Sequence, residues 1–210
     1  MISAVLWDFG GVILTSPFEA FARYEKELGL PVGFVRRVNA TNPDANAWAK
    51  LERSEVDAAG FAALFEEEAR ALGGEVSGAR VLELLAGDLR PEMVRALQAV
   101  KAAGYKTACL TNNIAAGNEG PENRRQHVAE VMGLFDAVVE SSKIGVRKPE
   151  TRFYELACET LGVTPTECVF LDDLGINLKP ARAMGMTTIK VEDPAAALAQ
   201  LSGVLGLPLA

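Results

Sequence analysis

Ala4-Val5-Leu6-Trp7-Asp8-Phe9-Gly10-Gly11-Val12 stands near the start of the chain and combines an apolar run, an aspartate and two glycines. The run Ala4–Trp7 is too short for a helix, and its composition is typical of a buried β-strand. Asp8 follows at once, so its carboxylate lies where the strand ends. In parallel α/β sheets, ligands bind at the carboxyl ends of the strands. The stretch therefore predicts a first strand that delivers an acid to a binding edge.

Similar short apolar runs recur later in the chain and alternate with helical patterns. The helix expected at Glu92–Ala103 follows Pro91 and stops at Gly104, the usual residues for a helix start and end. Strands that alternate with helices of this length form right-handed βαβ units. We therefore predict an α/β, Rossmann-like three-layer core with a parallel sheet. The other expected strands are Lys106–Leu110, Ala137–Val139, Cys168–Leu171 and Thr187–Val191, and the other core helices are Pro149–Leu161, Ile176–Met184 and Pro194 to about Leu205.

One long segment breaks this alternation, because only helical patterns occur between the first strand and Glu92. Phe61, Leu64, Phe65 and Leu72 form one apolar stripe of an amphipathic helix. The pattern predicts a helical cap inserted after the first strand, with residues 16–88 as the cap and residues 1–15 and 89–210 as the core. The helices expected in the cap are Phe18–Leu28, Val32–Val38, Asn46–Leu51, Asp57–Leu72 and Gly78–Leu85.

The composition limits the classes of partner. The 210 residues include 21 Lys plus Arg and 28 Asp plus Glu, a net charge of −7, which disfavours broad binding to nucleic acids or anionic membranes. The apolar share of 49% suits a folded globular core. We expect neither a signal peptide nor a membrane span, because the first apolar run stops at Asp8 and no long apolar stretch follows. Cys109, Cys158 and Cys168 lie in apolar runs and favour reduced thiols in a cytoplasmic protein.

Polar residues follow four of the expected strands. Asp8 follows the first, Thr111-Asn112 the second, Lys148 the third after a loop, and Asp172-Asp173 the fourth, with Asn177 one helical turn further. Helix capping explains Asp173 or Asn112 alone, but not three acids and a lysine at one edge. Clustered carboxylates repel unless a cation lies between them, and oxygen ligands with room for water favour Mg²⁺. The set indicates metal-assisted phosphoryl transfer with a carboxylate as nucleophile.

The chain resembles the haloacid dehalogenase superfamily of hydrolases over nearly its whole length. Four motifs match in order: Asp8-Phe9-Gly10-Gly11-Val12, Leu110-Thr111-Asn112, Lys148-Pro149-Glu150, and Leu171-Asp172-Asp173 with Asn177. The resemblance implies that Asp8 is the nucleophile, Thr111 binds phosphate and Lys148 neutralises charge. It also implies a Mg²⁺ site of Asp8, the Gly10 carbonyl, Asp172 and Asp173, and a substrate site that includes Gly10, Gly11, Thr111, Asn112 and Lys148.

Gly10 departs from the family pattern. In the phosphatases of the superfamily, the second residue after the nucleophile is normally an aspartate that serves as general acid and base. Glycine has no side chain, and loss of such a group costs about 10²–10⁴-fold in rate. The loss is largest for poor leaving groups such as alkoxides. Members that resemble the phosphatase-like domain of soluble epoxide hydrolases carry a similar glycine-rich motif, and the stretch Trp48-Ala49-Lys50-Leu51-Glu52-Arg53 also resembles theirs.

Three functions remain open on this basis. The favoured one is a Mg²⁺-dependent phosphatase for small phosphorylated metabolites, with an aspartyl-phosphate on Asp8. The second is C–X bond hydrolysis of the dehalogenase or phosphonatase type, the latter requiring a cap lysine, Lys26 or Lys50. The third is a ligand-binding module with weakened turnover, since a fold does not prove activity. His127, Arg124 and Arg125 are expected on a surface helix, with His127 a remote candidate acid–base group. The oligomeric state stays open.

Overall fold

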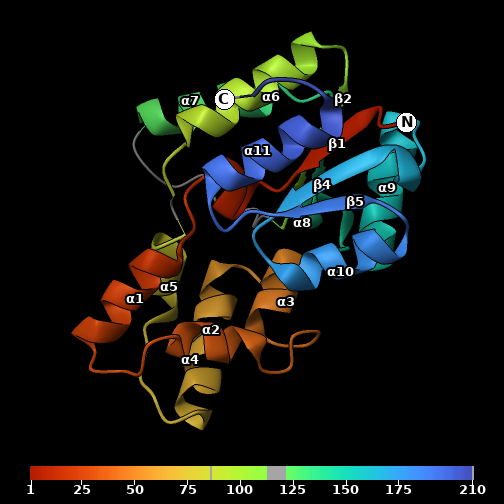
Figure 1. Cartoon of the computed structure of the whole chain (residues 1–210). Coiled ribbons are helices and arrows are strands. Elements are labelled where there is room, and N and C mark those ends of the chain that lie inside the picture. Colours follow the sequence, from red (N-terminus) through yellow and green to blue (C-terminus); the bar gives the residue numbers. More distant parts are fainter. Residues whose placement is uncertain (86, 113–121, 210) are drawn as a thin grey trace.

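The computed structural model describes residues 1–85, 87–112 and 122–209 of the chain. Its centre is a parallel sheet with the strand order β3-β2-β1-β4-β5 (Figure 1). Every strand begins at the predicted residue, and β2, β3, β4 and β5 each end one residue away from the predicted end. The strands are β1 Ala4–Trp7, β2 Lys106–Thr111, β3 Ala137–Glu140, β4 Cys168–Asp172 and β5 Thr187–Lys190.

Helices cover both faces of the sheet and make the three layers of the predicted fold class, which is confirmed (Figure 1). In β1, Val5 and Trp7 pack on one side against α6 (Pro91–Ala102), α7 (Glu122–Met132) and α11 (Pro194–Leu205). Ala4 and Leu6 point to the other side, against α9 (Thr151–Leu161) and α10 (Gly175–Ala183). Because alternate residues of a strand face opposite sides, a strand buried on both faces is apolar throughout.

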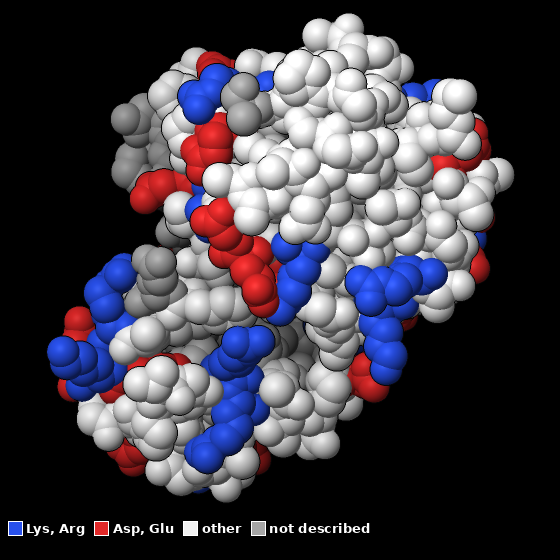
Figure 2. All heavy atoms as spheres, viewed as in Figure 1, with Lys and Arg blue, Asp and Glu red and all other residues white. Residues whose placement is uncertain are grey.

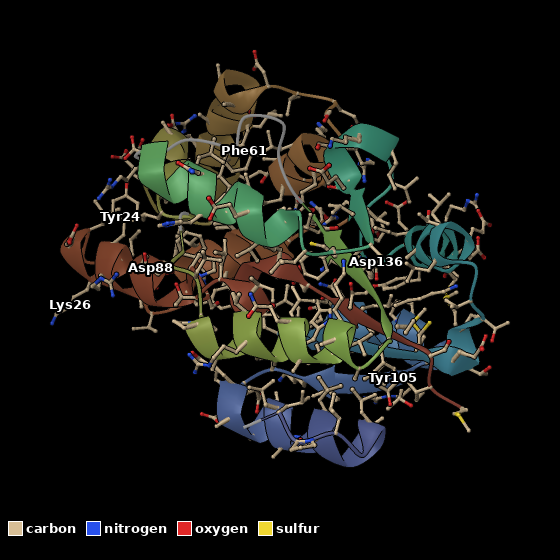
Figure 3. The ribbon with its side chains drawn as sticks, turned by 90° about the horizontal axis from the view of Figure 1, so that it is seen from above. Tyr24, Lys26, Phe61, Asp88, Tyr105 and Asp136 are labelled. Atoms are coloured by element: carbon tan, nitrogen blue, oxygen red, sulfur yellow. The ribbon has the colours of Figure 1, made fainter. Side chains whose placement is uncertain are left out.

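Five helices follow β1 and lie together beyond the carboxyl end of the sheet (Figure 1). They enclose an apolar cluster of their own, in which the rings of Trp48 and Phe61 have centroids 4.8 Å apart. Figure 3 shows Phe61 among these helices and Lys26 projecting outward. The helices are α1 Phe18–Glu27, α2 Phe34–Ala40, α3 Ala47–Glu52, α4 Ala58–Ala71 and α5 Gly78–Glu83. They form the predicted helical cap, whose exact boundaries at residues 16 and 88 stay a prediction.

The helix ends in the cap follow local chemistry. Asn46 and Asp57 were expected inside helices but cap them instead: Asn46 Oδ1 accepts from the Ala49 amide at 2.9 Å and Asp57 Oδ1 from the Gly60 amide at 2.8 Å. Gly33 has φ 80°, so α2 starts at Phe34 and not at Val32. A β-bridge between Leu14 and Leu89 joins the two chain segments that lead into and out of the cap.

Three short elements complete the core next to the strands. Phe9–Ile13 forms a wide turn after Asp8, in which Gly10 and Gly11 have non-helical backbone angles, and α8 (Ser141–Ile144) follows β3. A 3₁₀ turn at Pro165–Glu167 leads into β4. Within the described ranges, no helix combines the length and the apolar character needed to cross a bilayer.

Candidate active site

The register of the sheet brings Asp8 and Asp172 side by side. Trp7 pairs with Leu171 on the neighbouring strand β4, so the next residue of each strand meets at the same edge. The Asp8 amide donates to the Leu171 carbonyl at 2.8 Å. Asp8 Oδ1 accepts from the Phe9 amide at 2.6 Å, which turns the carboxylate toward the start of the following turn. Both carboxylates are buried.

Lys148 joins these two acids. Its side chain is 1% exposed, and Nζ lies 2.7 Å from Asp8 Oδ1 and 2.8 Å from Asp172 Oδ2. Burial disfavours the ammonium ion, but Asp172 and Asp8 more than offset this and raise the pKa of Lys148. Lys148 is therefore a fixed cation between two carboxylates.

Asp172 is held from the other side as well. Its Oδ1 accepts from the Leu174 amide at 2.8 Å, and Asn177 Nδ2 lies 3.0 and 3.1 Å from its two oxygens. Asn177 is buried in the first turn of α10. The asparagine noted one helical turn beyond Asp172 thus orients that carboxylate.

Three carboxylates lie close together here, and only part of their negative charge is neutralised. Oxygen atoms of Asp8, Asp172 and Asp173 lie within 4.8 Å of one another. Burial and the charge of Asp172 together raise the pKa of Asp173 to about 6, although Lys148 lowers it. Burial also raises the pKa of Asp8; Lys148 lowers it, while Asp172 and Asp173 add to the rise. One ammonium for three acids leaves excess negative charge, which suits a divalent cation with oxygen ligands.

The two glycines at positions 10 and 11, shortly after Asp8, differ in their surroundings. Gly10 is exposed with φ −72° and ψ 130°, and a Cβ built on it would have no atom within 4 Å. Gly11 is buried with φ 78°, and a Cβ there would lie 2.2 Å from Asp173 Oδ2. Gly10 thus leaves open space beside Asp8, whereas Gly11 lets the turn approach Asp173.

Thr111 and Asn112 stand at the end of β2. Thr111 is buried and is the last residue of the strand. Asn112 binds the backbone of Lys148 twice: Oδ1 accepts from the Lys148 amide at 2.8 Å, and Nδ2 donates to its carbonyl at 2.9 Å. The resemblance implied that Asn112 belongs to the substrate site. Its side chain has the additional role of fixing the segment that carries Lys148.

A cap residue that the sequence did not single out also reaches this edge. Glu52, the last residue of α3, pairs with Arg147 Nε, and its Oε2 accepts from Asn112 Nδ2 at 3.3 Å. Burial raises the pKa of Glu52 to about 7, against the effects of Arg147, Lys148 and Asn112, which lower it. The only sequence signal was an acid that follows the apolar residues of a short helix. Nothing local showed which core residue it meets.

The remaining candidates lie apart from the cluster or outside the described residues. His127 is exposed on α7. Lys26 is exposed, and Lys50 is half-buried on α3. The side chains of Arg124 and Arg125 lie outside the described part of the structure.

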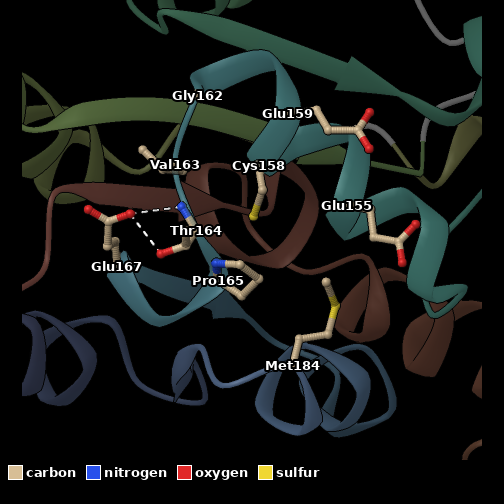
Figure 4. A pocket seen from close by; sticks show the side chains of 9 residues that line it. All are labelled: Glu155, Cys158, Glu159, Gly162, Val163, Thr164, Pro165, Glu167 and Met184. Carbon is tan, nitrogen blue, oxygen red and sulfur yellow. Dashed lines mark hydrogen bonds between the residues drawn. The ribbon is translucent and has the colours of Figure 1, made fainter.

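Two shallow hollows lie at the opposite edge of the sheet, where strands begin. One is lined by Cys158 and Glu159 of α9 and by the turn from Thr164 to Glu167 that precedes β4 (Figure 4). Glu167 Oε2 accepts from the amide and hydroxyl of Thr164 at 2.8 and 2.7 Å, which closes that turn. Lys101, Tyr105 and Asp136 line the other hollow, before β2 and β3. Neither hollow contains a predicted site residue.

Charges are unevenly distributed over the surface. On the face in Figure 2, charged side chains lie mainly on the cap and along its junction with the core, whereas much of the core surface is uncharged. The junction is where the acids and Lys148 described above are located. The negative charge of the chain thus includes a group of buried acids at the junction, which Lys148 neutralises only in part.

The geometry agrees with a known family of enzymes. The family model described as haloacid dehalogenase-like hydrolase matches residues 2–185. The chain belongs to this family of hydrolases. The resemblance seen in the four motifs is thereby confirmed, and so is the expectation of an enzyme.

Curated relatives match the chain over nearly all of its length. The mouse acyl-CoA dehydrogenase family member 10 is 34% identical over 98% of this chain and 19% of its own length. The pig bifunctional epoxide hydrolase 2 is 33% identical over 99% of this chain and 40% of its own length. The chain thus spans less than half of these relatives. The sesquiterpene phosphatase astK of Aspergillus oryzae is 26% identical, with 97% and 96% of the two chains covered.

Solved structures share the fold. The L-2-haloacid dehalogenase of Xanthobacter autotrophicus, with chloropropionic acid covalently bound, superposes with a TM-score of 0.60 at 22% identity, covering 97% of this chain and 83% of that one. The enzyme bt-2542 of Bacteroides thetaiotaomicron, an Asp12Ala mutant with magnesium and inorganic phosphate, gives a TM-score of 0.60 at 19% identity, with 92% and 97% covered. At these identities the likeness concerns the fold.

Proposed function

We propose that the chain is a Mg²⁺-dependent phosphatase for small phosphorylated metabolites and that Asp8 is its nucleophile. The observation that carries this proposal is the buried set at the carboxyl edge, in which Lys148 Nζ lies 2.7 Å from Asp8 Oδ1 and three carboxylates cluster within 4.8 Å. A phosphatase among the full-length relatives supports it. In the same family, a protein of this fold binds magnesium and phosphate.

The acid cluster fits the proposed cation. Asp8, Asp172, Asp173 and the Gly10 carbonyl would hold Mg²⁺, and burial together with mutual repulsion already raises the pKa values of Asp8 and Asp173. When bound, the ion supplies positive charge that offsets the carboxylates and the phosphoryl oxygens. Lys148 supplies a second positive charge, and Thr111, Asn112 and Gly11 complete the proposed substrate site.

The proposed reaction has two steps. An Asp8 oxygen bonds to phosphorus while the bond from phosphorus to the ester oxygen breaks, and the leaving alkoxide or phenoxide takes a proton from water. A water molecule then attacks the phosphorus of the aspartyl-phosphate, and the bond to Asp8 breaks. Inorganic phosphate is released and the carboxylate is restored. Gly10 offers no side chain to move the protons, so good leaving groups are favoured.

We propose that the protein acts on small phosphorylated molecules and that it is located in the cytoplasm. The buried free thiols of Cys109, Cys158 and Cys168 support a reducing compartment.

The test is hydrolysis of p-nitrophenyl phosphate and acetyl phosphate with and without Mg²⁺. We expect turnover that requires Mg²⁺ and is lost in Asp8→Asn, which keeps the size of the side chain but removes the nucleophile. Asp193→Asn, at an exposed helix start, is the matched control and should retain turnover. A folded wild-type protein without turnover on a full panel of phosphate esters would contradict the proposal and favour a ligand-binding module.

A further inference from the structure

Several contacts between cap and core meet on the segment that leads to Lys148. Glu52 of α3 pairs with Arg147, and Arg147 Nη1 donates to the carbonyl of Pro43, in the loop before α3, at 2.8 Å. Two residues after the end of α3, Ser54 Oγ donates to the Ser142 carbonyl at 3.0 Å. The α2–α3 loop and the end of α3 therefore both hold the segment 142–147, which immediately precedes Lys148.

The same glutamate reaches Lys148 by a second route. Glu52 Oε2 accepts from Asn112 Nδ2 at 3.3 Å, and that amide group also donates to the Lys148 carbonyl at 2.9 Å. Asn112 Oδ1 accepts from the Lys148 amide at 2.8 Å. A shift of Glu52 would thus act on both neighbours that position the Lys148 backbone.

The ion pair of Glu52 and Arg147 is largely buried, which favours a role in orienting its neighbours. The side chains of Glu52 and Arg147 are each 13% exposed. A buried ion pair gains little net stability, because desolvation of both charges offsets their attraction. Its directional contacts nevertheless fix where the two groups lie. Here the groups that are fixed flank the ammonium between Asp8 and Asp172.

We propose that Glu52 is a positioning residue that couples docking of the cap to placement of Lys148, through Arg147 on one side and Asn112 on the other. Its consequence for turnover rests on the proposed function, in which Lys148 neutralises the phosphoryl group. With the cap docked, Lys148 is held against Asp8. Without the Glu52 contacts, Arg147 and Asn112 lose the carboxylate that links them, and the segment before Lys148 keeps the cap contacts of Arg147 with Pro43 and of Ser142 with Ser54.

The test compares the full-length wild type with Glu52→Gln, Arg147→Gln and the double variant. Glu83→Gln is the control, because it removes an exposed glutamate–arginine pair of the cap that lies at the end of α5. Backbone amide exchange of residues 142–148 is measured without substrate, together with the melting temperature. kcat and KM for p-nitrophenyl phosphate with saturating Mg²⁺ are measured on the same samples.

We expect the Lys148 amide to exchange about tenfold faster in Glu52→Gln and in Arg147→Gln but not in Glu83→Gln, since its hydrogen bond to Asn112 is less well held. kcat should fall about 10–100-fold, because a small misplacement of a charge-neutralising group is costly. The double variant should be no worse than either single one, as expected for residues that act through one contact.

The exchange and kinetic results separate the two proposals. Unchanged exchange at Lys148 in folded Glu52→Gln and Arg147→Gln would overturn the positioning role, whatever the activity. Additive losses in the double variant would also overturn it. The two variants could show faster exchange at Lys148 while the wild-type protein hydrolyses no phosphate ester. That result would support the positioning role and contradict only the proposed phosphatase. If Glu52→Gln fails to fold, Arg147→Gln carries the test.

Discussion

The carboxylate of Asp173 lies against the backbone of Gly11, so that a Cβ on Gly11 would stand 2.2 Å from Asp173 Oδ2. Gly11 also has φ 78°, a left-handed conformation that costs other residues about 1–2 kcal/mol. The turn after Asp8 and the acidic residue Asp173 after β4 are thereby in direct contact. This contact brings the first and the last motif of the chain into one site.

Gly11→Ala should therefore damage both stability and the proposed metal site. The added methyl group must displace Asp173, so we expect a loss of about 2–3 kcal/mol in the free energy of unfolding. We also expect weaker Mg²⁺ binding, measured by titration calorimetry. Gly104→Ala is the matched control, because Gly104 has φ 88° and open space around its Cβ position. Equal effects of the two substitutions would show that contact with Asp173 has no role.

Gly10→Asp, unlike Gly11→Ala, should leave the fold intact and improve turnover. The backbone at Gly10 accepts any residue and its Cβ position is open, so the variant should fold with little change in melting temperature. A carboxyl group there would supply the proton that alkoxide leaving groups need. We expect alkyl-phosphate turnover to rise about 10-fold or more, and aryl-phosphate turnover to change less. Gly10→Asn, which adds similar bulk without a titratable acid, should give no such rise. Unchanged alkyl-phosphate turnover in folded Gly10→Asp would show that another group already moves the proton.

Asp173 should make the stability of the metal-free protein depend on pH. Its pKa is raised to about 6 in the folded state, mainly by burial. An acid with a raised pKa contributes stability that is complete below its unfolded pKa, near 4, and is lost as the pH rises through about 6. We expect a loss of about 2 kcal/mol between pH 4 and 7 from this group.

Mg²⁺ should restore that stability, since it favours the ionised carboxylates. The rise in melting temperature on adding Mg²⁺ should be larger at pH 8 than at pH 5. In Asp173→Asn the metal-free protein should be more stable at pH 8 than the wild type, and the Mg²⁺ effect should shrink. Glu192→Gln, at an exposed site, should behave as the wild type. An equal Mg²⁺ effect at both pH values would argue against binding at these acids.

Lys148→Met should leave Asp8 and Asp172 facing each other without their cation. Removal of one partner from a buried ion pair costs about 3–5 kcal/mol. We expect that loss in urea unfolding at neutral pH without metal, and a complete loss of phosphatase activity. Adding Asp8→Asn to Lys148→Met should recover part of the stability, because one of the unpaired charges is then gone. Lys179→Met, on the exposed face of α10, should change stability by less than about 0.5 kcal/mol.

Much of the core follows from local patterns in the sequence. Apolar runs of strand length predicted the bounds of the strands to within one residue. Gly104 and Gly162 predicted where two of the helices end. The meeting of Asp8 and Asp172 also follows, because equivalent positions of neighbouring parallel strands end at one edge. The predicted starts of the cap helices were less accurate. Asn46 and Asp57 have side chains that can cap a helix or lie within it, and the pattern alone did not distinguish these two roles.

The amino-acid sequence by itself determined the elements, their order and the residues that the strands present at one edge, because these depend on spacing within short segments. Only the tertiary structure decided that Asp173 rests on Gly11, that Asn112 holds Lys148 by its backbone, and that Glu52 of the cap pairs with Arg147. These contacts join segments far apart in the chain. They depend on how separately formed elements pack against one another, which no local pattern encodes.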